Sequence, residues 1–295
     1  MRTMESIFTD FKQTFRRGSM LAKLIYINAG VFIFVRLAVV LLMLFNIDGA
    51  SFLRYLQVPS SLSLLVIRPW TLVTYMFTHF DFWHILFNML WLYWFGKIFL
   101  LFFNEKQLGG LYILGGLAGA FLFVLAYNLF PYFDTYVPNS YLMGASASVM
   151  AIVFAVSFYR KDFEINLFLV GRVKLIYLAI FTFVIDLLAV TSSNAGGHIA
   201  HVGGALLGIW FANRIARGKD LTAPVNRLVD WVVNLGKRKP KMKVTYNRRE
   251  KDYEYNARKN RDNEEIDRIL DKLRRSGYGS LSAEEKRKLF EASKK

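Results

Sequence analysis

The sequence predicts an all-α membrane protein whose chain crosses the bilayer several times. Three observations support this fold class. Of the 295 residues, 54% are hydrophobic and 16% are aromatic, which is more apolar than a typical soluble domain. Charged residues concentrate after residue 214, so the preceding chain is long, apolar and sparsely charged. Several of its apolar runs reach the roughly 20 residues that a helix needs to cross the hydrocarbon.

Six membrane spans are predicted from these apolar runs. The second run is long enough to tilt or to extend past the bilayer. The fourth is short, which is tolerable only if other helices shield it. The spans are expected at residues 22–45, 73–102, 108–130, 144–159, 170–190 and 198–213.

Basic residues gather on one side of the predicted spans, which marks that side as cytosolic. They occur in the N-terminal segment, in the loop after the fourth span and after the sixth span, whereas loops 131–143 and 191–197 contain none. Loop 46–70 has only Arg54 and Arg68, and its amphipathic, aromatic sequence predicts that it lies in the outer interface. Both termini are therefore expected in the cytosol.

The chain is expected to divide into four parts, of which the second contains all the spans. They are a cytosolic N-terminal segment (1–21), a six-helix membrane domain (22–215), a basic amphipathic surface segment with a linker (216–262) and a two-helix cytosolic extension (263–295). Cysteine is absent, which excludes a disulfide framework and thiol chemistry.

The tail after the last span predicts a membrane-surface segment followed by two helices. Residues 222–236 are amphipathic, and the basic run 237–243 favours anionic lipid headgroups at about 1 kcal/mol per basic residue. Residues 244–262 are polar and are expected to form a linker. The first helix of the extension should stop at Gly277, and the second should open with a capping box at Ser282. A tail tied to the membrane favours lipid or a cytosolic partner over nucleic acid.

Polar residues inside the apolar spans point to a site. In each even-numbered span, one polar residue lies 13 or 14 positions before a basic residue that should mark the cytosolic interface. The pairs are His84 and Lys97, Ser146 and Arg160, and His201 and Arg214. Because a helix rises 1.5 Å per residue, each polar residue should lie roughly 20 Å from that interface. All three are therefore expected at one depth, near the outer side.

The spans that carry these residues have suitable local chemistry. Ser146 opens the fourth span, where free backbone N–H groups can support a developing oxyanion. Gly204 and Gly208 form a GxxxG face on the sixth span, and His201 lies on the same side. If the neighbour of that face is the fourth span, the serine and the histidine come within reach, and histidine is the base that activates such a nucleophile.

The sequence resembles the rhomboid family of intramembrane serine proteases. The resemblance rests on "HFDFWHILFN" in the second span, "GAS" at 144–146, and "AHVGG" followed by Gly208 in the sixth span. It covers roughly residues 20–215. It implies that Ser146 is the nucleophile and His201 the general base, acting as a dyad. His84 and Asn88, which are i,i+4 neighbours on one helix face, are then the side-chain donors to the oxyanion.

The resemblance also assigns supporting residues. His79 matches the family's second histidine of this span, which has a structural role and is expected to hold the first loop. Gly144 belongs to the serine motif. Two positions depart from the family pattern: Ala147 stands where glycine is usual, and Met150 where tyrosine often packs on the catalytic histidine. Glu105 is expected to bond the turn between the second and third spans.

Several alternatives remain at the level of single residues. His198, one turn before His201, is a second candidate for the base. Asp186 could orient His201 as a third member of a triad, although the family's dyad favours a helix-contact role. Ser146 or Ser148 could instead bond the carbonyl four residues earlier, as serines in helices often do.

The predicted function is hydrolysis of a peptide bond near the outer end of a substrate's transmembrane helix, without metal or cofactor. The resemblance to bacterial rhomboids implies a location in the cytoplasmic membrane, with the site toward the outer face. One alternative is a non-catalytic rhomboid-like scaffold that binds transmembrane helices. A second is a bis-histidine haem protein, since the chain has four histidines on two spans. A zinc protease is disfavoured because the chain lacks H-E-x-x-H. The oligomeric state stays open.

Overall fold

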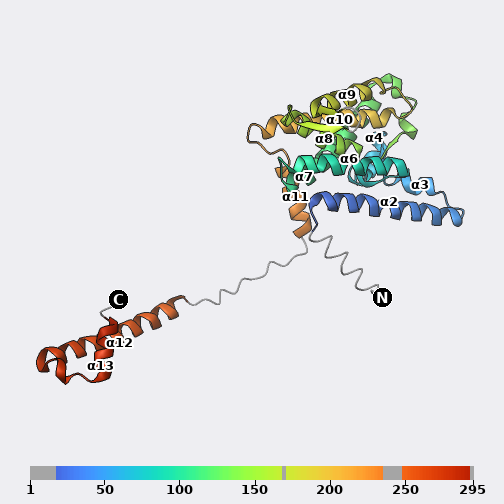
Figure 1. Ribbon diagram of the computed structural model, residues 1–295. Coiled ribbons are helices and arrows are strands. Elements are labelled where there is room, and N and C mark those ends of the chain that lie inside the picture. Colours follow the sequence, from blue (N-terminus) through green and yellow to red (C-terminus); the bar gives the residue numbers. More distant parts are fainter. Residues whose placement is uncertain (1–17, 168–170, 235–247, 293–295) are drawn as a thin grey trace, which may run out of the picture. The chain divides into compact units, whose positions relative to one another are not determined.

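The computed structural model describes residues 18–167, 171–234 and 248–292. The chain forms two compact units, Met1–Leu235 and Gly236–Lys295, and the two are described separately (Figure 1). The basic run at 237–243 and nearly all of the N-terminal segment at 1–21 lie outside the described residues.

Six helices form the body of the first unit, and most of them run roughly along a common direction in Figure 1. They are α2 (Met20–Leu44), α6 (Phe82–Leu100), α7 (Glu105–Leu129), α8 (Ser146–Tyr159), α9 (Leu175–Leu188) and α10 (Ala195–Ile215). Among the described helices, α2 and α7 are long and apolar enough by themselves to cross a membrane, and α8 and α9 are shorter apolar helices. The outer surface of α2 is largely apolar and exposed, as a lipid-facing helix requires.

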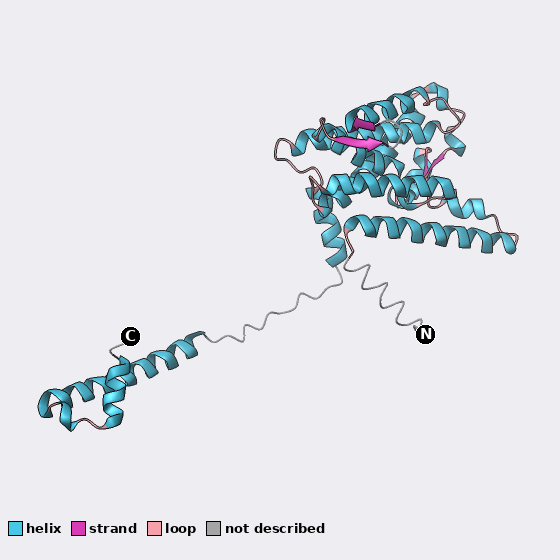
Figure 2. Ribbon diagram, viewed as in Figure 1, coloured by secondary structure: helices cyan, strands magenta, loops and turns pink. Residues whose placement is uncertain are grey.

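Short elements fill the connections, and the structure corrects two of the predicted spans. The second span is not one helix over 73–102, because the chain breaks at Thr78–Asp81 before α6 begins. The fifth begins at Leu175, since residues before it form a strand pair (Figure 2). The short elements are α3 (Gly49–Arg54), β1 (Val58–Pro59), α4 (Leu62–Ile67), α5 (Thr71–Thr74), η1 (Tyr75–Phe77), η2 (Pro131–Phe133), η3 (Val137–Asn139), β2 (Tyr141–Leu142), β3 (Glu164–Leu167) and β4 (Gly171–Lys174).

The two strand pairs are antiparallel and tie connections together. In the first, Val58 lies opposite Leu142, so the connection before α6 is joined to the connection before α8. In the second, β3 and β4 form a hairpin between α8 and α9. A period-two pattern of two to four residues is too short to stand out beside long apolar runs, which explains why the sequence did not predict either pair.

The short helix α8 is the centre of the bundle. Every residue from Ala147 to Ser157 is buried, and α8 packs against α6, α7, α9 and α10. The expectation that other helices shield this span is confirmed. Because Ala147–Ser157 do not meet lipid, the helix does not need the length of a lipid-exposed span, and its 14 residues are sufficient.

Glycines allow the helices around α8 to approach backbone to backbone. On α10, a methyl group at Gly204 would overlap the carbonyl oxygen of Ala147, and one at Gly208 would overlap that of Ala151. On α7, a methyl group at Gly115 would lie 2.5 Å from the Ala151 side chain. The predicted GxxxG face of α10 therefore does face α8, and small residues are the usual means of such close packing in membranes.

Polar contacts tie α2 to α7. The side-chain amide of Asn28 donates to the Tyr112 hydroxyl over 3.0 Å in a fully buried position. Glu105 accepts a hydrogen bond from the backbone N–H of Met20, 3.3 Å away. The expectation that Glu105 bonds the preceding turn is wrong, because a capping box between Asn104 and Gln107 closes that turn instead.

Helix α11 (Ala223–Asn234) crosses the ends of the bundle helices in Figure 1. Gly110 of α7 leaves room for Thr222 and Asn226, and Lys106 pairs with Asp230 over 2.8 Å. A row of large apolar side chains on α11 is exposed: Leu228, Val229, Trp231, Val232 and Val233. The predicted amphipathic helix is confirmed, and its exposed apolar row suits a membrane interface.

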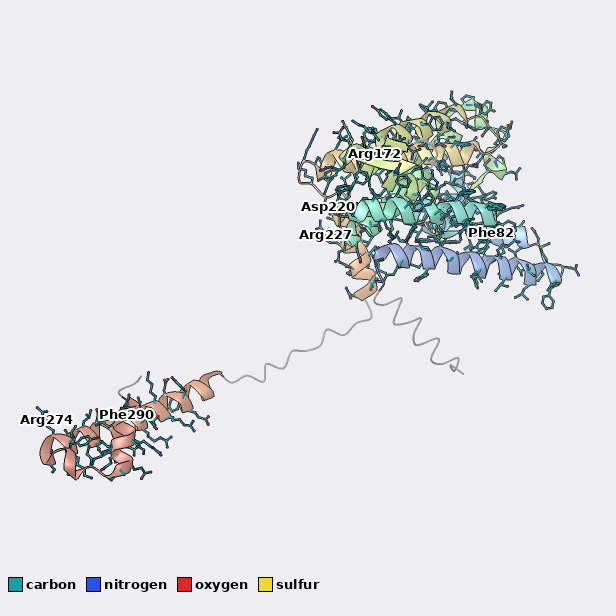
Figure 3. All side chains as sticks on the ribbon, in the orientation of Figure 1. Phe82, Arg172, Asp220, Arg227, Arg274 and Phe290 are labelled. Carbon is teal, nitrogen blue, oxygen red and sulfur yellow. The ribbon has the colours of Figure 1, made fainter. Side chains whose placement is uncertain are left out.

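Several charged residues lie toward one end of the bundle. In Figure 3, Arg172, Asp220 and Arg227 lie toward the end where α11 is found, and Phe82 lies toward the other. Lys174 pairs with Asp162 over 2.8 Å at the hairpin. The hydrogen bond and the positive charge of Lys174 lower the pKa of Asp162. The same hydrogen bond and the negative charge of Asp162 raise the pKa of Lys174.

The second unit consists of α12 (Arg248–Ser276), η4 (Tyr278–Ser280) and α13 (Ala283–Ala292). The linker expected at 244–262 is wrong from Arg248 onward, because this polar stretch is rich in Arg, Lys and Glu, which are strong helix formers. The predicted stop is confirmed, since Gly277 follows α12 with φ of 76°. Positive φ is easily reached only by glycine.

The capping box at the start of α13 is also confirmed. The Ser282 N–H donates to Glu285 over 2.7 Å, and the Glu285 N–H donates to the Ser282 hydroxyl over 3.2 Å. Lys272 and Lys288 bridge α12 and α13 through Glu285 and Glu265. The Ser282 N–H first, and Lys272 second, lower the pKa of Glu285.

Replacing Gly204 with alanine should destabilise the bundle. The added methyl group overlaps the carbonyl of Ala147, and such overpacking typically costs about 1–3 kcal/mol. Thermal unfolding in detergent should show a lower midpoint for Gly204→Ala. Gly30→Ala is the matched control, because nothing lies within 4 Å of the added methyl group on α2. Equal midpoints for Gly204→Ala and wild type would contradict the packing described for α8 and α10.

Candidate active site

The polar residues predicted at one depth lie around one cavity. This cavity has a volume of about 630 Å³ and is lined by His84, Asn88, Ser146 and His201, among others. A smaller cavity of about 260 Å³ shares three of these four residues and is also lined by α9. The structure thus brings together side chains from α6, α8 and α10, as the depth calculation predicts.

Ser146 is the first residue of α8, and the backbone before it is held tightly. Gly144 has φ of 116°, which disfavours any other residue, and its N–H donates to the Tyr75 carbonyl over 2.9 Å. The first N–H groups of a helix have no partner within the helix. The Ser146 hydroxyl therefore lies beside backbone donors that face outward from the start of α8.

His79 holds the residue directly before the serine. Its Nε2 accepts a hydrogen bond from the Ala145 N–H, 3.2 Å away, in a fully buried position. Because Nε2 accepts, the ring proton of the neutral imidazole lies on Nδ1. His79 therefore has a structural contact, as expected, but its hydrogen-bond partner is the turn before Ser146 and not the first loop.

His84 and Asn88 lie near Gly144 at the start of α6. Asp81 caps this helix by accepting from the His84 N–H over 2.9 Å. A methyl group at Gly144 would lie 2.8 Å from His84 Nε2, so the ring approaches the serine turn because glycine is there. The Asn88 amide donates one hydrogen to the His84 carbonyl over 2.9 Å, which leaves its second N–H for another acceptor.

His201 comes from α10, one turn before Gly204, and the contact of Gly204 with the Ala147 carbonyl fixes its distance from α8. The side chain is about 20% exposed and lines both cavities with Ser146. Within the described residues, no hydrogen bond joins the two side chains. Hydrogen bonds between catalytic groups often form or shorten only when substrate is bound.

Asp186 of α9 contacts both histidines of α10. Its Oδ1 lies 2.8 Å from His198 Nδ1 and 2.9 Å from His201 Nδ1. Asp186 therefore makes a helix contact, as expected, and it makes it through the candidate base itself. The sequence signal was a lone carboxylate in an apolar helix. His198, the other candidate for the base, is not among the residues that line the cavities with Ser146.

The same three side chains could also hold a metal ion. One ligand atom from each of Asp186, His198 and His201 lies within 4.8 Å of the others, and zinc accepts such ligands. The distances of 2.8 and 2.9 Å are those of direct hydrogen bonds, in which protons join the three side chains.

The two departures from the family pattern have different neighbours. Ala147 is buried, and its methyl group lies against Gly119 of α7. Where α10 approaches this residue, Gly204 meets its carbonyl group. Met150 lines the smaller cavity with His201. Ser148 is fully buried next to Gly116 of α7 and makes no hydrogen bond with the described residues, so it does not face the cavity.

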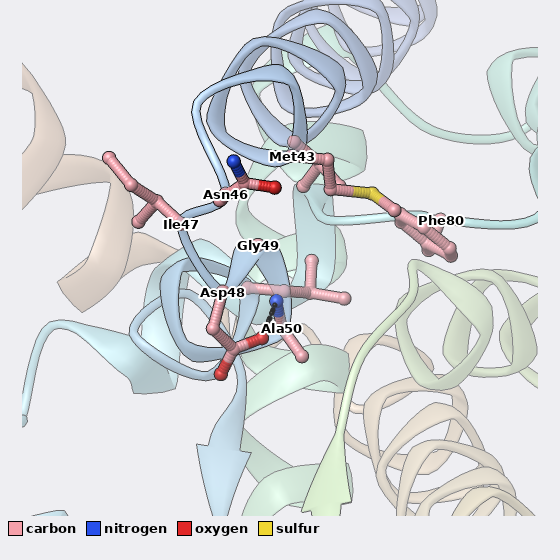
Figure 4. A pocket seen from close by; sticks show the side chains of 9 residues that line it. Met43, Asn46, Ile47, Asp48, Gly49, Ala50 and Phe80 are labelled. Atoms are coloured by element: carbon pink, nitrogen blue, oxygen red, sulfur yellow. Dashed lines mark hydrogen bonds between the residues drawn. The ribbon is translucent and has the colours of Figure 1, made fainter.

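A further cavity, of about 540 Å³, lies where α2 meets α3 (Figure 4). Its lining is mostly apolar, and its one carboxylate, Asp48, turns to the start of α3 and accepts from the Ala50 N–H over 2.9 Å. The hydroxyl of Ser51 first, and that N–H second, lower the pKa of Asp48. The described residues that line this cavity include no convergent catalytic groups.

The comparisons with known proteins give the class. The Rhomboid domain matches residues 67–217, just over half of the chain. The chain therefore belongs to the rhomboid family, and its helices form an all-α membrane bundle of that kind. Residues 249–295 match a second family, DUF6576, which is described as a family of unknown function.

Two curated relatives are similar over about half of this chain. "RHOMBOID-like protein 12, mitochondrial" of Arabidopsis thaliana is 29% identical over 161 residues, which are 52% of this chain and 48% of the plant protein. "Presenilin-associated rhomboid-like protein, mitochondrial" of Bos taurus is 28% identical over 146 residues, 46% of this chain and 35% of the bovine protein. The chain thus spans less than half the length of either relative.

Proposed function

We propose that this chain is an intramembrane serine endopeptidase that cleaves near the outer end of a substrate's transmembrane helix. One observation carries the proposal. Ser146, His201, His84 and Asn88, from three different helices, line a single cavity at the start of α8. A nucleophile, a base and donors to an oxyanion are the parts that acyl transfer needs.

The chemistry assigns one step to each group. The Ser146 oxygen attacks the scissile carbonyl carbon while His201 Nε2 takes the hydroxyl proton. The carbonyl oxygen becomes an oxyanion, which the free N–H of Asn88, His84 and the first backbone N–H groups of α8 stabilise. His201 then gives its proton to the leaving amine. His201 then takes a proton from a water molecule, whose oxygen attacks the acyl carbon. The ester bond breaks as His201 gives that proton to the Ser146 oxygen, which releases the acid product.

The substrate must present an extended segment in this cavity. A transmembrane helix has no free carbonyl group, so part of it has to unwind, which small or helix-breaking residues make easier. The smaller cavity lies between α6 and α9, with Phe87 and Trp91 on one side and Thr182 and Ile185 on the other. We place the entry there. Ser193 and Asn194 line the larger cavity and form its cap.

The competing function is a non-catalytic scaffold that binds transmembrane helices, and a serine probe separates the two. Wild-type protein in detergent should react with a fluorescent fluorophosphonate and should cleave a transmembrane substrate, and Ser146→Ala should abolish both. Ser148→Ala is the matched control, because this neighbouring hydroxyl faces α7 and should leave both readouts intact. Folded wild-type protein that neither reacts nor cleaves would favour the scaffold.

Asn88→Ala should lower the cleavage rate without preventing formation of the bundle. Loss of one donor to an oxyanion typically costs on the order of 10²–10³ in rate. Single-turnover cleavage in liposomes measures this step, and thermal unfolding checks the fold. A fully active Asn88→Ala variant would remove Asn88 from the oxyanion site.

We further place the bundle in a bacterial cytoplasmic membrane, with both termini in the cytosol and α11 on anionic lipid. The charged end of the bundle and the exposed apolar row of α11 support this orientation. Because the chain has no cysteine, single cysteines report topology directly. An impermeant maleimide should label Asp134→Cys in intact bacteria, and should label Ser280→Cys only after permeabilisation. The reverse pattern would overturn the orientation.

A further inference from the structure

Asp186 is a buried carboxylate in a helix with one largely exposed, apolar side. Asp186 is 5% exposed, whereas Phe181, Ile185 and Leu188 of the same helix are exposed. A carboxylate in a membrane bundle is costly unless it is partnered, and such residues usually have a function. The proposed hydrolysis does not use Asp186 in any step.

The partners of Asp186 are two ring nitrogens that meet a single oxygen. His198 and His201 are i,i+3 neighbours on α10, so their rings lie on one helix face. Both Nδ1 atoms lie within 2.9 Å of Asp186 Oδ1. An ionised carboxylate only accepts hydrogen bonds, so each Nδ1 must donate.

This arrangement selects one tautomer of His201. With the proton on Nδ1, Nε2 keeps its lone pair and is the nitrogen that can accept a proton from serine. Asp186, His201 and Ser146 also line the same smaller cavity, and His198 does not. The carboxylate therefore acts on the ring that faces the nucleophile.

A restraint on His201 is needed because its usual neighbour is missing. Met150 occupies the position, one turn after Ser146, where an aromatic ring would restrain the imidazole. A thioether side chain is flexible and makes no directional bond to the ring. Asp186 supplies the directional contact from another helix, α9.

We propose that Asp186 is a positioning residue for His201: its hydrogen bond to Nδ1 from α9 sets the tautomer and the orientation of the base that faces Ser146. This rests on the proposed peptidase function. It adds a third residue to the Ser–His pair, acting through the histidine without touching the substrate. The contact of His198 with the same oxygen helps to keep the carboxylate in place.

Asp186→Asn is the test, because it keeps the shape and can leave Nδ1 without its proton. The full chain in liposomes with EDTA should show a fall in kcat of about 10²-fold or more, the usual contribution of a correctly placed base. KM should stay within about threefold of the wild-type value, since Asp186 does not touch the substrate and its binding is unchanged. His198→Gln should lose less than about tenfold, because it leaves the His201 contact in place.

A second readout does not depend on turnover. Ring ¹⁵N chemical shifts show which nitrogen of a histidine carries the proton. His201 should be protonated at Nδ1 in the Ser146→Ala protein and should lose this preference when Asp186→Asn is added. Thermal unfolding of both proteins should show that the bundle stays folded.

The outcomes separate the two hypotheses. Active wild type with an equally active Asp186→Asn variant would overturn the positioning role alone. An inactive wild type without EDTA would overturn the peptidase function, while the ¹⁵N readout would still test the contact. Wild-type activity that EDTA removes would overturn the proposal in favour of a metal on these three side chains.

Discussion

The close approach of α7 and α10 to α8 is the constraint on which the rest of the structure depends. In lipid, no hydrophobic force drives helices together, and packing between small residues takes its place. Gly204 meets the carbonyl of Ala147, the residue after the serine. His201 lies one turn from that contact. The distance between the candidate nucleophile and base is therefore fixed by backbone contact, and the cavity forms where that packing ends.

A second requirement is that irregular backbone inside the bundle finds partners. The chain breaks before α6 and again before α8, where it would leave polar groups without partners in an apolar setting. His79 accepts the Ala145 N–H, and the Tyr75 carbonyl accepts the Gly144 N–H. Both bonds run from the segment before α6 to the turn before α8. The segment before α6 thus helps to hold the serine turn, which is why a histidine is buried there.

The sequence predicted the parts of the site that follow from helix periodicity. Ser146, His201, His84 and Asn88 lie on helices whose register can be counted from basic residues at one interface, so their common depth followed from spacing. The contacts of His79 and Glu105 could not be counted in this way, because each joins segments far apart in the chain. The same holds for Asp186, whose distance to His201 depends on how α9 leans against α10.

The elements that the sequence missed have equally physical causes. The break before α6 lies within an apolar run. Apolar side chains can be buried in a helix or in a turn, so hydropathy does not reveal the break. The start of α12 is polar throughout, and polarity alone does not separate a solvated helix from a linker; the strong helix propensity of Glu, Lys and Arg decides the outcome. Where strong end signals were present, at Gly277 and Ser282, both helix ends were predicted.

The position of Asp186 on α9 has a consequence for an enzyme surrounded by lipid. Phospholipid ester bonds are easier acyl donors than amides, and a permanently activated serine in a bilayer would meet them continually. Under the proposed mechanism, a molecule that moves α9 away from α10 as it enters also draws the carboxylate away from His201. His201 is then oriented only after α9 has returned to its place beside the bound substrate. A lipid chain that keeps α9 displaced thus meets a serine whose base is not oriented. Selectivity against lipids then arises because His201 is positioned only after α9 has returned.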